Sequence, residues 1–127
     1  MNITLLLVED DVLARESEAF ELRRAGYKVL TASSLLEASR WFLHAQPDLV
    51  LVDIGMPDGD GTVVARWLQA ANVPFVFVTA RSRAGDVRHG LEMGALDYIV
   101  KPVGLDELVA RVGAVARRAG LAGSAAG

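Results

Sequence analysis

Short, continuously apolar runs alternate along the chain with longer segments in which apolar residues recur every three or four positions. The runs cover residues 4–8, 27–31, 49–52, 74–78 and 98–100. Each is too short for a helix and rich in Val, Leu and Ile, so each predicts a β-strand. Because runs such as LLLV, LVLV and FVFV have no polar face, we expect these strands to be covered on both sides.

The longer segments predict five amphipathic helices. The first, at about residues 13–24, has a patchy apolar stripe, and the fourth, at about residues 85–92, is short. The other three carry clear stripes: Leu35, Ala38, Trp41 and Phe42; Val64, Trp67, Leu68 and Ala71; Leu105, Leu108, Val109, Val112 and Val115. Strands that alternate with helices predict a doubly wound α/β fold, a flavodoxin-like five-stranded parallel sheet with five helices on two faces.

Length and composition are those of one domain. A chain of 127 residues, 52% of them hydrophobic, can build one core, which we assign to residues 1–119. Residues 120–127 have no stripe to bury and are interpreted as a flexible tail or truncated linker. A net charge of -3 argues against direct nucleic-acid binding. The absence of cysteine and of a long apolar run predicts a cytoplasmic chain without disulfides or a membrane span.

Polar residues gather where the predicted strands end. The first strand leads into Glu9, Asp10 and Asp11, and the third, fourth and fifth end at Asp53, Thr79 and Lys101. In a parallel sheet these ends share one edge, and ligands bind there at the point where the strand order reverses. For the order 2-1-3-4-5 the reversal lies between strands one and three. The acidic cluster and Asp53 are therefore expected to lie side by side.

Several carboxylates this close require a compensating cation, because like charges at about 4 Å repel strongly. An all-oxygen ligand set without His or Cys favours Mg²⁺, with Mn²⁺ as a substitute, over Zn²⁺. Lys101 could hold a second phosphoryl oxygen opposite the metal. The Thr79 hydroxyl and a neighbouring backbone N–H, assigned to Ala80, could donate to the third. These groups fit phosphoryl transfer to a carboxylate nucleophile.

Four segments, LLLVEDD, DLVLVDIGMPDGDG, FVFVTA and GALDYIVKP, occur in this order, and from about residue 3 to 118 the chain resembles the CheY-like receiver family of bacterial response regulators. The resemblance implies that Asp53 accepts a phosphoryl group from a histidine kinase or phosphotransfer protein. It also implies that Glu9 and Asp10 hold Mg²⁺ together with Asp53 and the backbone carbonyl of Gly55. Asp11 lies outside the pair of acids that the family uses.

The same resemblance implies a conformational switch. Thr79 would be the switch hydroxyl, Tyr98 the aromatic residue that turns inward on activation, and Lys101-Pro102 a candidate cis peptide bond. The fourth helix, fifth strand and fifth helix would form the responsive face, through which a homodimer could assemble. Four charged residues resemble the salt-bridge residues that the family has on this face: Asp97, Glu107, Arg111 and Arg118. A DNA-binding effector domain, if present, would lie outside this chain.

Other functions remain open at this point. A receiver-like docking or dimerisation module without phosphorylation would share the fold, and failure to bind Mg²⁺ would favour it. An aspartate-nucleophile phosphohydrolase would need a second acid where the chain has Gly55. A flavodoxin-like nucleotide binder would need N–H donors and positive charge rather than an acidic crevice. We therefore expect a signalling phosphoacceptor and not an enzyme that turns over a separate substrate.

Overall fold

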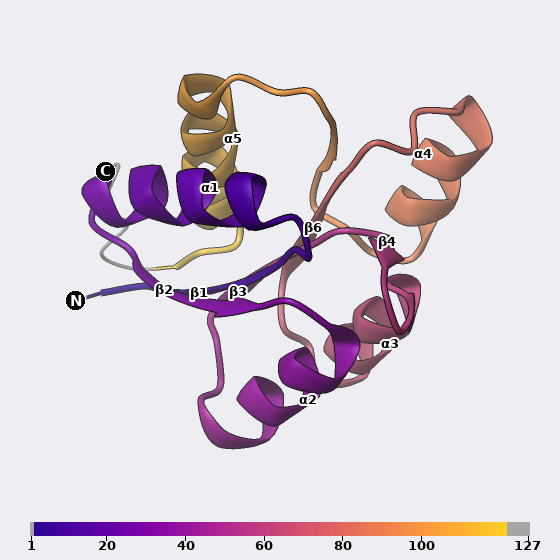
Figure 1. Cartoon of the computed structure of the whole chain (residues 1–127), viewed down its shortest axis with the longest axis horizontal. Helices are drawn as coiled ribbons and strands as arrows, with labels where there is room; N and C mark the ends of the chain where they lie inside the picture. Colours follow the sequence, from indigo (N-terminus) through magenta and orange to yellow (C-terminus); the bar gives the residue numbers. More distant parts are fainter. Residues whose placement is uncertain (1, 122–127) are drawn as a thin grey trace.

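A computed structural model describes residues 2–121 and contains one five-stranded parallel sheet (Figure 1). Its strands are β1 (Thr4–Val8), β2 (Lys28–Ala32), β3 (Leu49–Val52), β6 (Phe75–Thr79) and β7 (Tyr98–Val100). They are ordered β2-β1-β3-β6-β7. Counted along the chain as five strands, this is the order 2-1-3-4-5, so the predicted doubly wound fold is confirmed. The second and fourth strands begin one residue later than predicted.

Five helices cover the sheet: α1 (Val12–Arg24), α2 (Leu35–His44), α3 (Thr62–Ala70), α4 (Ala84–Glu92) and α5 (Leu105–Arg118). Helices α1 and α5 lie together on one side of the sheet, and α2 and α3 lie on the other (Figure 1). Helix α4 contacts β7, and its Val87 packs with the core on the side of α2 and α3. Ser34 caps the start of α2, because its hydroxyl accepts a hydrogen bond from the Glu37 N–H at 3.1 Å.

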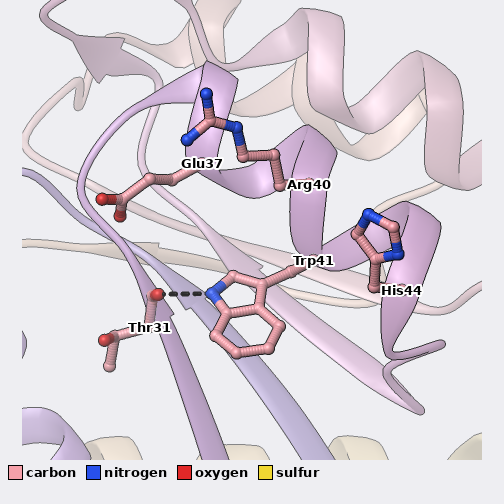
Figure 2. A pocket seen from close by; sticks show the side chains of 5 residues that line it. All are labelled: Thr31, Glu37, Arg40, Trp41 and His44. Carbon is pink, nitrogen blue, oxygen red and sulfur yellow. Dashed lines mark hydrogen bonds between the residues drawn. The ribbon is translucent and has the colours of Figure 1, made fainter.

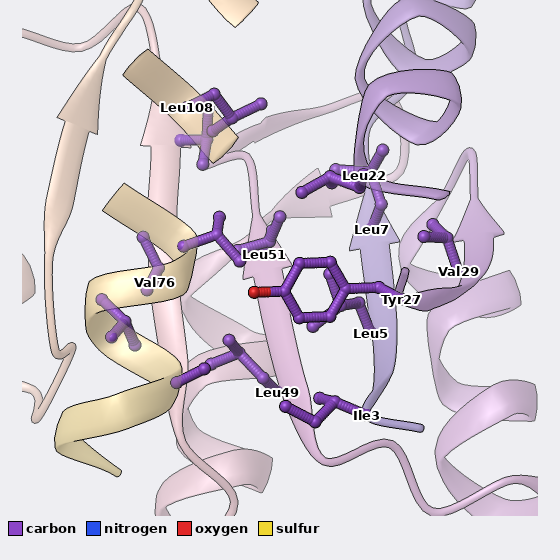
Figure 3. Packing of buried hydrophobic residues seen from close by; sticks show 14 of the residues in the cluster. Ile3, Leu5, Leu7, Leu22, Tyr27, Val29, Leu49, Leu51, Val76 and Leu108 are labelled. Atoms are coloured by element: carbon purple, nitrogen blue, oxygen red, sulfur yellow. The ribbon is translucent and has the colours of Figure 1, made fainter. Parts of the chain in front are cut away.

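Alternate residues of the central strands supply two separate cores. Leu5 and Leu7 of β1 pack beneath α1 and α5 with Leu22 and Leu108, as Figure 3 shows. Leu6, between them in sequence, belongs to the cluster beneath α2 and α3. Because side chains alternate across a strand, a strand that is buried on both sides must be apolar throughout. This explains why the sequence of β1 lacks a polar face.

The free edge of β2 is protected by two side chains. Residues 28, 30 and 32 of β2 face β1, so the carbonyls of Val29 and Thr31 point outward. The Arg23 guanidinium donates to the Val29 carbonyl at 2.9 Å, and the Trp41 indole N–H donates to the Thr31 carbonyl at 2.8 Å (Figure 2). Trp41, predicted only to pack, therefore also satisfies an edge carbonyl that could otherwise pair with another chain.

A short hairpin follows β3. Strands β4 (Gly55–Met56) and β5 (Gly59–Asp60) pair in antiparallel fashion. At the tip, the Asp58 carboxylate accepts hydrogen bonds from the Leu35 and Leu36 N–H groups at 2.8 and 3.1 Å. The loop after Asp53 is thus attached to the first turn of α2.

The packed part of the chain extends slightly past the predicted boundary. Gly120 closes α5 with a positive φ of 73°, and Leu121 packs against the core beneath α1 and α5. Residues 122–127 of the predicted tail lie outside the described part. The Lys101-Pro102 bond is cis, as the resemblance implied. Between residues 2 and 121, no helix is long and apolar enough to cross a membrane.

Candidate functional site

Three carboxylates converge at the carboxyl-terminal edge of the sheet. Val8 of β1 is paired with Val52 of β3, so Glu9 and Asp53 follow the two strands side by side. The Asp53 N–H donates to the Val8 carbonyl at 3.0 Å. One carboxylate oxygen from each of Glu9, Asp10 and Asp53 lies within 4.8 Å of the others. The predicted juxtaposition of the acids is therefore present.

Lys101 lies directly between two of these acids. Its ammonium group donates a hydrogen bond to Asp53 Oδ2 at 2.9 Å and another to Glu9 Oε1. The Lys101 N–H also donates to the Thr79 carbonyl at 2.8 Å, which fixes the end of β7 to that of β6. Burial alone would lower the pKa of Lys101, but the hydrogen bonds to Glu9 and Asp53 raise it. The lysine is therefore a fixed positive charge at the site.

Glu9 is the most deeply buried of the acids, with 2% of its surface exposed. Burial raises its pKa, against the opposing effect of the Lys101 hydrogen bond. Both of its oxygens already have partners, since Oε2 accepts from the Asp11 N–H at 3.1 Å. Asp10, in contrast, is exposed at the edge of the site. Glu9 thus orients Lys101, whereas Asp10 and Asp53 offer more accessible oxygens.

The donor set fits a hard divalent cation. All three side chains offer oxygen, and Lys101 supplies one positive charge against three carboxylates. Oxygen-only sites with several carboxylates bind Mg²⁺ or Mn²⁺ in preference to softer metals. Glu9, Asp10 and Asp53 would hold the ion. The backbone carbonyl of Gly55, an exposed residue two positions after Asp53, stays a predicted ligand.

The backbone around Asp53 is closely packed on one side and open on the other. The Gly55 N–H donates to Asp53 Oδ1 at 3.1 Å, and a Cβ added to Gly55 would meet no atom within 4 Å. A Cβ at Gly61 would lie 2.0 Å from the Asp53 carbonyl oxygen. Gly61 must therefore be glycine for the hairpin to close against Asp53. The side of Gly55 is open to solvent.

A chain of hydrogen bonds links the end of β6 to β7. Thr79 is buried, and its hydroxyl accepts from the Arg81 N–H at 3.3 Å. The Arg81 carbonyl in turn accepts from the Tyr98 hydroxyl at 2.8 Å. Tyr98 is buried, and this burial raises its pKa. Thr79 and Tyr98, both predicted switch residues, are joined through the backbone N–H and carbonyl of Arg81. Ala80, which precedes Arg81, is exposed.

Two residues that the sequence analysis did not single out lie next to the site. The Arg15 guanidinium donates to the Glu9 and Asp10 carbonyls at 3.0 and 3.2 Å and holds the acidic loop against α1. Glu18, one turn further along α1, is buried, and its Oε1 has no hydrogen-bond partner among the described residues. The sequence alone does not show its inward position, because the apolar stripe of this helix is patchy.

The face formed by β7 and α5 carries part of the predicted ion-pair set. Arg111 contacts Asp97 at 2.8 Å and Glu107 at 3.2 Å. The pKa of Asp97 is lowered because the Arg111 hydrogen bonds outweigh its partial burial. Arg118 donates to the Leu96 carbonyl at 2.7 Å and makes no ion pair with these acids. Arg111 is thus the centre of this cluster.

Comparison with known proteins places these features in a family. A model described as the response regulator receiver domain matches residues 5–113. The phosphate regulon transcriptional regulatory protein PhoB of Pseudomonas aeruginosa is 39% identical over 121 residues, covering 92% of this chain and 53% of that protein. The transcriptional regulatory protein PrrA of Mycobacterium tuberculosis is 44% identical over 118 residues, covering 91% and 51%. The chain spans about half the length of these curated relatives.

The solved structures agree with this match. The non-phosphorylated HemR receiver domain from Leptospira biflexa superposes with a TM-score of 0.85 at 34% sequence identity. The alignment covers 90% of this chain and 94% of that one. The similarity therefore extends over nearly the whole of both chains.

Proposed function

Because the chain belongs to the response regulator receiver domain family of two-component signalling systems, we propose that it accepts a phosphoryl group on Asp53 from a sensor histidine kinase or phosphotransfer protein. The observation that carries the proposal is the contact of Asp53 with Lys101 beside the open flank at Gly55. A carboxylate oxygen of Asp53 forms a bond to phosphorus while the bond from phosphorus to the imidazole nitrogen of the donor breaks.

The residues around Asp53 stabilise the charge of the transferred group. Lys101 donates to one phosphoryl oxygen, and the Thr79 hydroxyl and Ala80 N–H donate to another. Glu9 holds Lys101 in place through its hydrogen bond. Bound by Glu9, Asp10, Asp53 and the Gly55 carbonyl, Mg²⁺ would neutralise charge on the phosphoryl oxygens.

The proposed response begins at Thr79. When the Thr79 hydroxyl turns toward the phosphoryl group, it gives up the hydrogen bond from the Arg81 N–H. The Arg81 carbonyl accepts a hydrogen bond from the Tyr98 hydroxyl, so a movement of the Arg81 backbone changes the balance between buried and exposed positions of Tyr98. That change alters the surface of α4, β7 and α5, through which a homodimer could form.

The wider role follows from the relatives. Several are named transcriptional regulators, and each is about twice as long as the aligned segment. We therefore propose that the receiver controls an effector domain, such as a DNA-binding domain, in a longer cytoplasmic protein. The receiver itself, with a net charge of -3, would not bind DNA directly.

Acetyl phosphate tests the central step without the kinase. Wild-type protein incubated with acetyl phosphate and Mg²⁺ should gain the mass of one phosphoryl group. Asp53→Asn should gain none, and EDTA should prevent the gain in wild type. Asp106→Asn, which removes an exposed acid on α5, serves as the matched control and should behave as wild type. An unmodified wild type would instead support a docking module without phosphorylation.

A further inference from the structure

Helix α4 rests on the sheet through a glycine. Gly90 is the buried residue of this helix. A Cβ added there would lie 2.7 and 2.8 Å from Cδ2 and Cε2 of Tyr98 and 3.0 Å from Cδ2 of Phe77. Contacts this short do not persist in a packed interior, so a side chain at position 90 requires one of its neighbours to move.

The Tyr98 ring fills the space that the missing side chain leaves. Tyr98 as a whole is 5% exposed, and the centroid of its ring lies 5.8 Å from that of Phe77. The Tyr98 hydroxyl donates to the Arg81 carbonyl at 2.8 Å. Because the Arg81 N–H donates to the Thr79 hydroxyl, the buried ring is connected to the end of β6 at the phosphoryl-acceptor site.

We propose that Gly90 is the positioning residue for Tyr98: its lack of a side chain allows the ring to lie buried beneath α4 and so sets the resting balance of the switch. This inference rests on the proposed function for its signalling consequence, but the packing relation itself does not. The proposal gives α4 a role in the switch, because the helix provides the space beside Gly90 that the Tyr98 ring occupies.

The neighbours of Gly90 differ in their freedom to move. Phe77 is fully buried on β6 and also packs edge-on against Phe75, so neighbouring side chains surround it. Tyr98 reaches toward Arg81, an exposed residue, and its ring can rotate outward with the loss of one hydrogen bond. A side chain at position 90 should therefore expel Tyr98 and leave Phe77 in place.

Fluorine NMR on protein labelled with 3-fluorotyrosine tests the assignment. The chain has two tyrosines, and Tyr27 lies in the opposite core beneath α1 and α5, so its signal is an internal reference. In Gly90→Ala the Tyr98 signal should move toward the free amino-acid value and broaden strongly with a soluble paramagnetic agent. The Tyr27 signal should not change. A Tyr98 signal that stays protected in Gly90→Ala would overturn the proposal.

The matched control is Gly85→Ala in the same helix, where an added Cβ would meet no atom within 4 Å. Alanine favours helix over glycine, so this variant should shift the urea midpoint upward. Gly90→Ala should shift the midpoint downward in the presence of Tyr98. In a Tyr98→Ala background, where the ring is gone and only the 3.0 Å contact with Phe77 remains, the downward shift should be much smaller. An equal loss in both backgrounds would mean that Gly90 does not act through the ring.

The fluorine NMR signal and the urea midpoint test the packing of Tyr98 against Gly90 separately from the signalling function, because both are measured on unphosphorylated protein. If acetyl phosphate fails to modify the wild type while Gly90→Ala still exposes Tyr98, the proposed function is wrong and the packing assignment stands. If Asp53 is phosphorylated but Gly90→Ala leaves Tyr98 buried, the assignment is wrong and the proposed function stands.

Discussion

Glu18 makes the stability of the domain depend on pH in a calculable way. The side chain is 5% exposed, and its Oε1 has no hydrogen-bond partner among residues 2–121. Burial, and next the negative charge of Glu9, raise its pKa from an ordinary 4.5 to about 7, although Lys101 partly opposes this. The folded protein therefore binds the Glu18 proton more tightly than the unfolded chain does.

The sign and size follow from this difference. For an acid with a raised folded pKa, the stabilising contribution is fully present below the unfolded value and is lost as pH rises through the folded value. One pKa unit corresponds to about 1.4 kcal/mol, so ionising buried Glu18 costs roughly 3 kcal/mol at about pH 8. Glu18→Gln, which stays neutral, avoids this cost. Relative to wild type, the variant should gain roughly 3 kcal/mol between about pH 4 and pH 8.

Urea unfolding followed by circular dichroism in metal-free buffer measures the difference across this range. Groups that titrate equally in both proteins cancel when the two free energies of unfolding are subtracted. Glu16→Gln removes an exposed acid from the same helix and should show no such trend. A difference between Glu18→Gln and wild type that does not change with pH would refute the reasoning, because Glu18 would then be ionised at little cost.

Three further changes test the site and its supports. Lys101→Met leaves Glu9 and Asp53 without the lysine ammonium group and should lower the free energy of unfolding at neutral pH by about 3 kcal/mol. Added Mg²⁺ should restore part of this loss, and an unchanged urea midpoint would contradict the expectation. Gly61→Ala places a Cβ against the Asp53 carbonyl oxygen and should lower the free energy of unfolding by about 2 kcal/mol. It should also slow the phosphorylation of Asp53 by acetyl phosphate, and a wild-type rate would argue against the close packing. Trp41→Phe removes the hydrogen bond to the Thr31 carbonyl of the edge strand and should lower the free energy of unfolding by about 1 kcal/mol. An unchanged midpoint of thermal unfolding would show that water replaces this hydrogen bond.

The sequence was sufficient for the sheet because its strands are buried on both sides. Runs without a polar face locate β1, β3 and β7 to the residue, and a parallel sheet then brings Glu9 and Asp53 to one edge. The start of β2 was misplaced by one residue because Tyr27 is as apolar as the strand that it precedes, although it packs from the preceding turn.

What could not be predicted depends on distances between elements. Nothing in the pattern around Asp58 distinguishes an ordinary turn from a hairpin that bonds to the start of α2. Glu18 reads as a polar break in a patchy helix until the packing of α1 shows that it points inward. Gly90 is likewise an ordinary helical glycine in sequence, and its relation to Tyr98 exists only in the folded chain.

The most direct test of the account is the position of the phosphoryl group. After reaction with acetyl phosphate and Mg²⁺, reduction by borohydride converts a phosphorylated aspartate to homoserine, which peptide mass spectrometry can locate. Homoserine at position 53, lost when EDTA is present, is the predicted result. Homoserine at position 10 or 11, with Asp53 intact, would contradict the assignment of Asp53 as the acceptor beside Lys101.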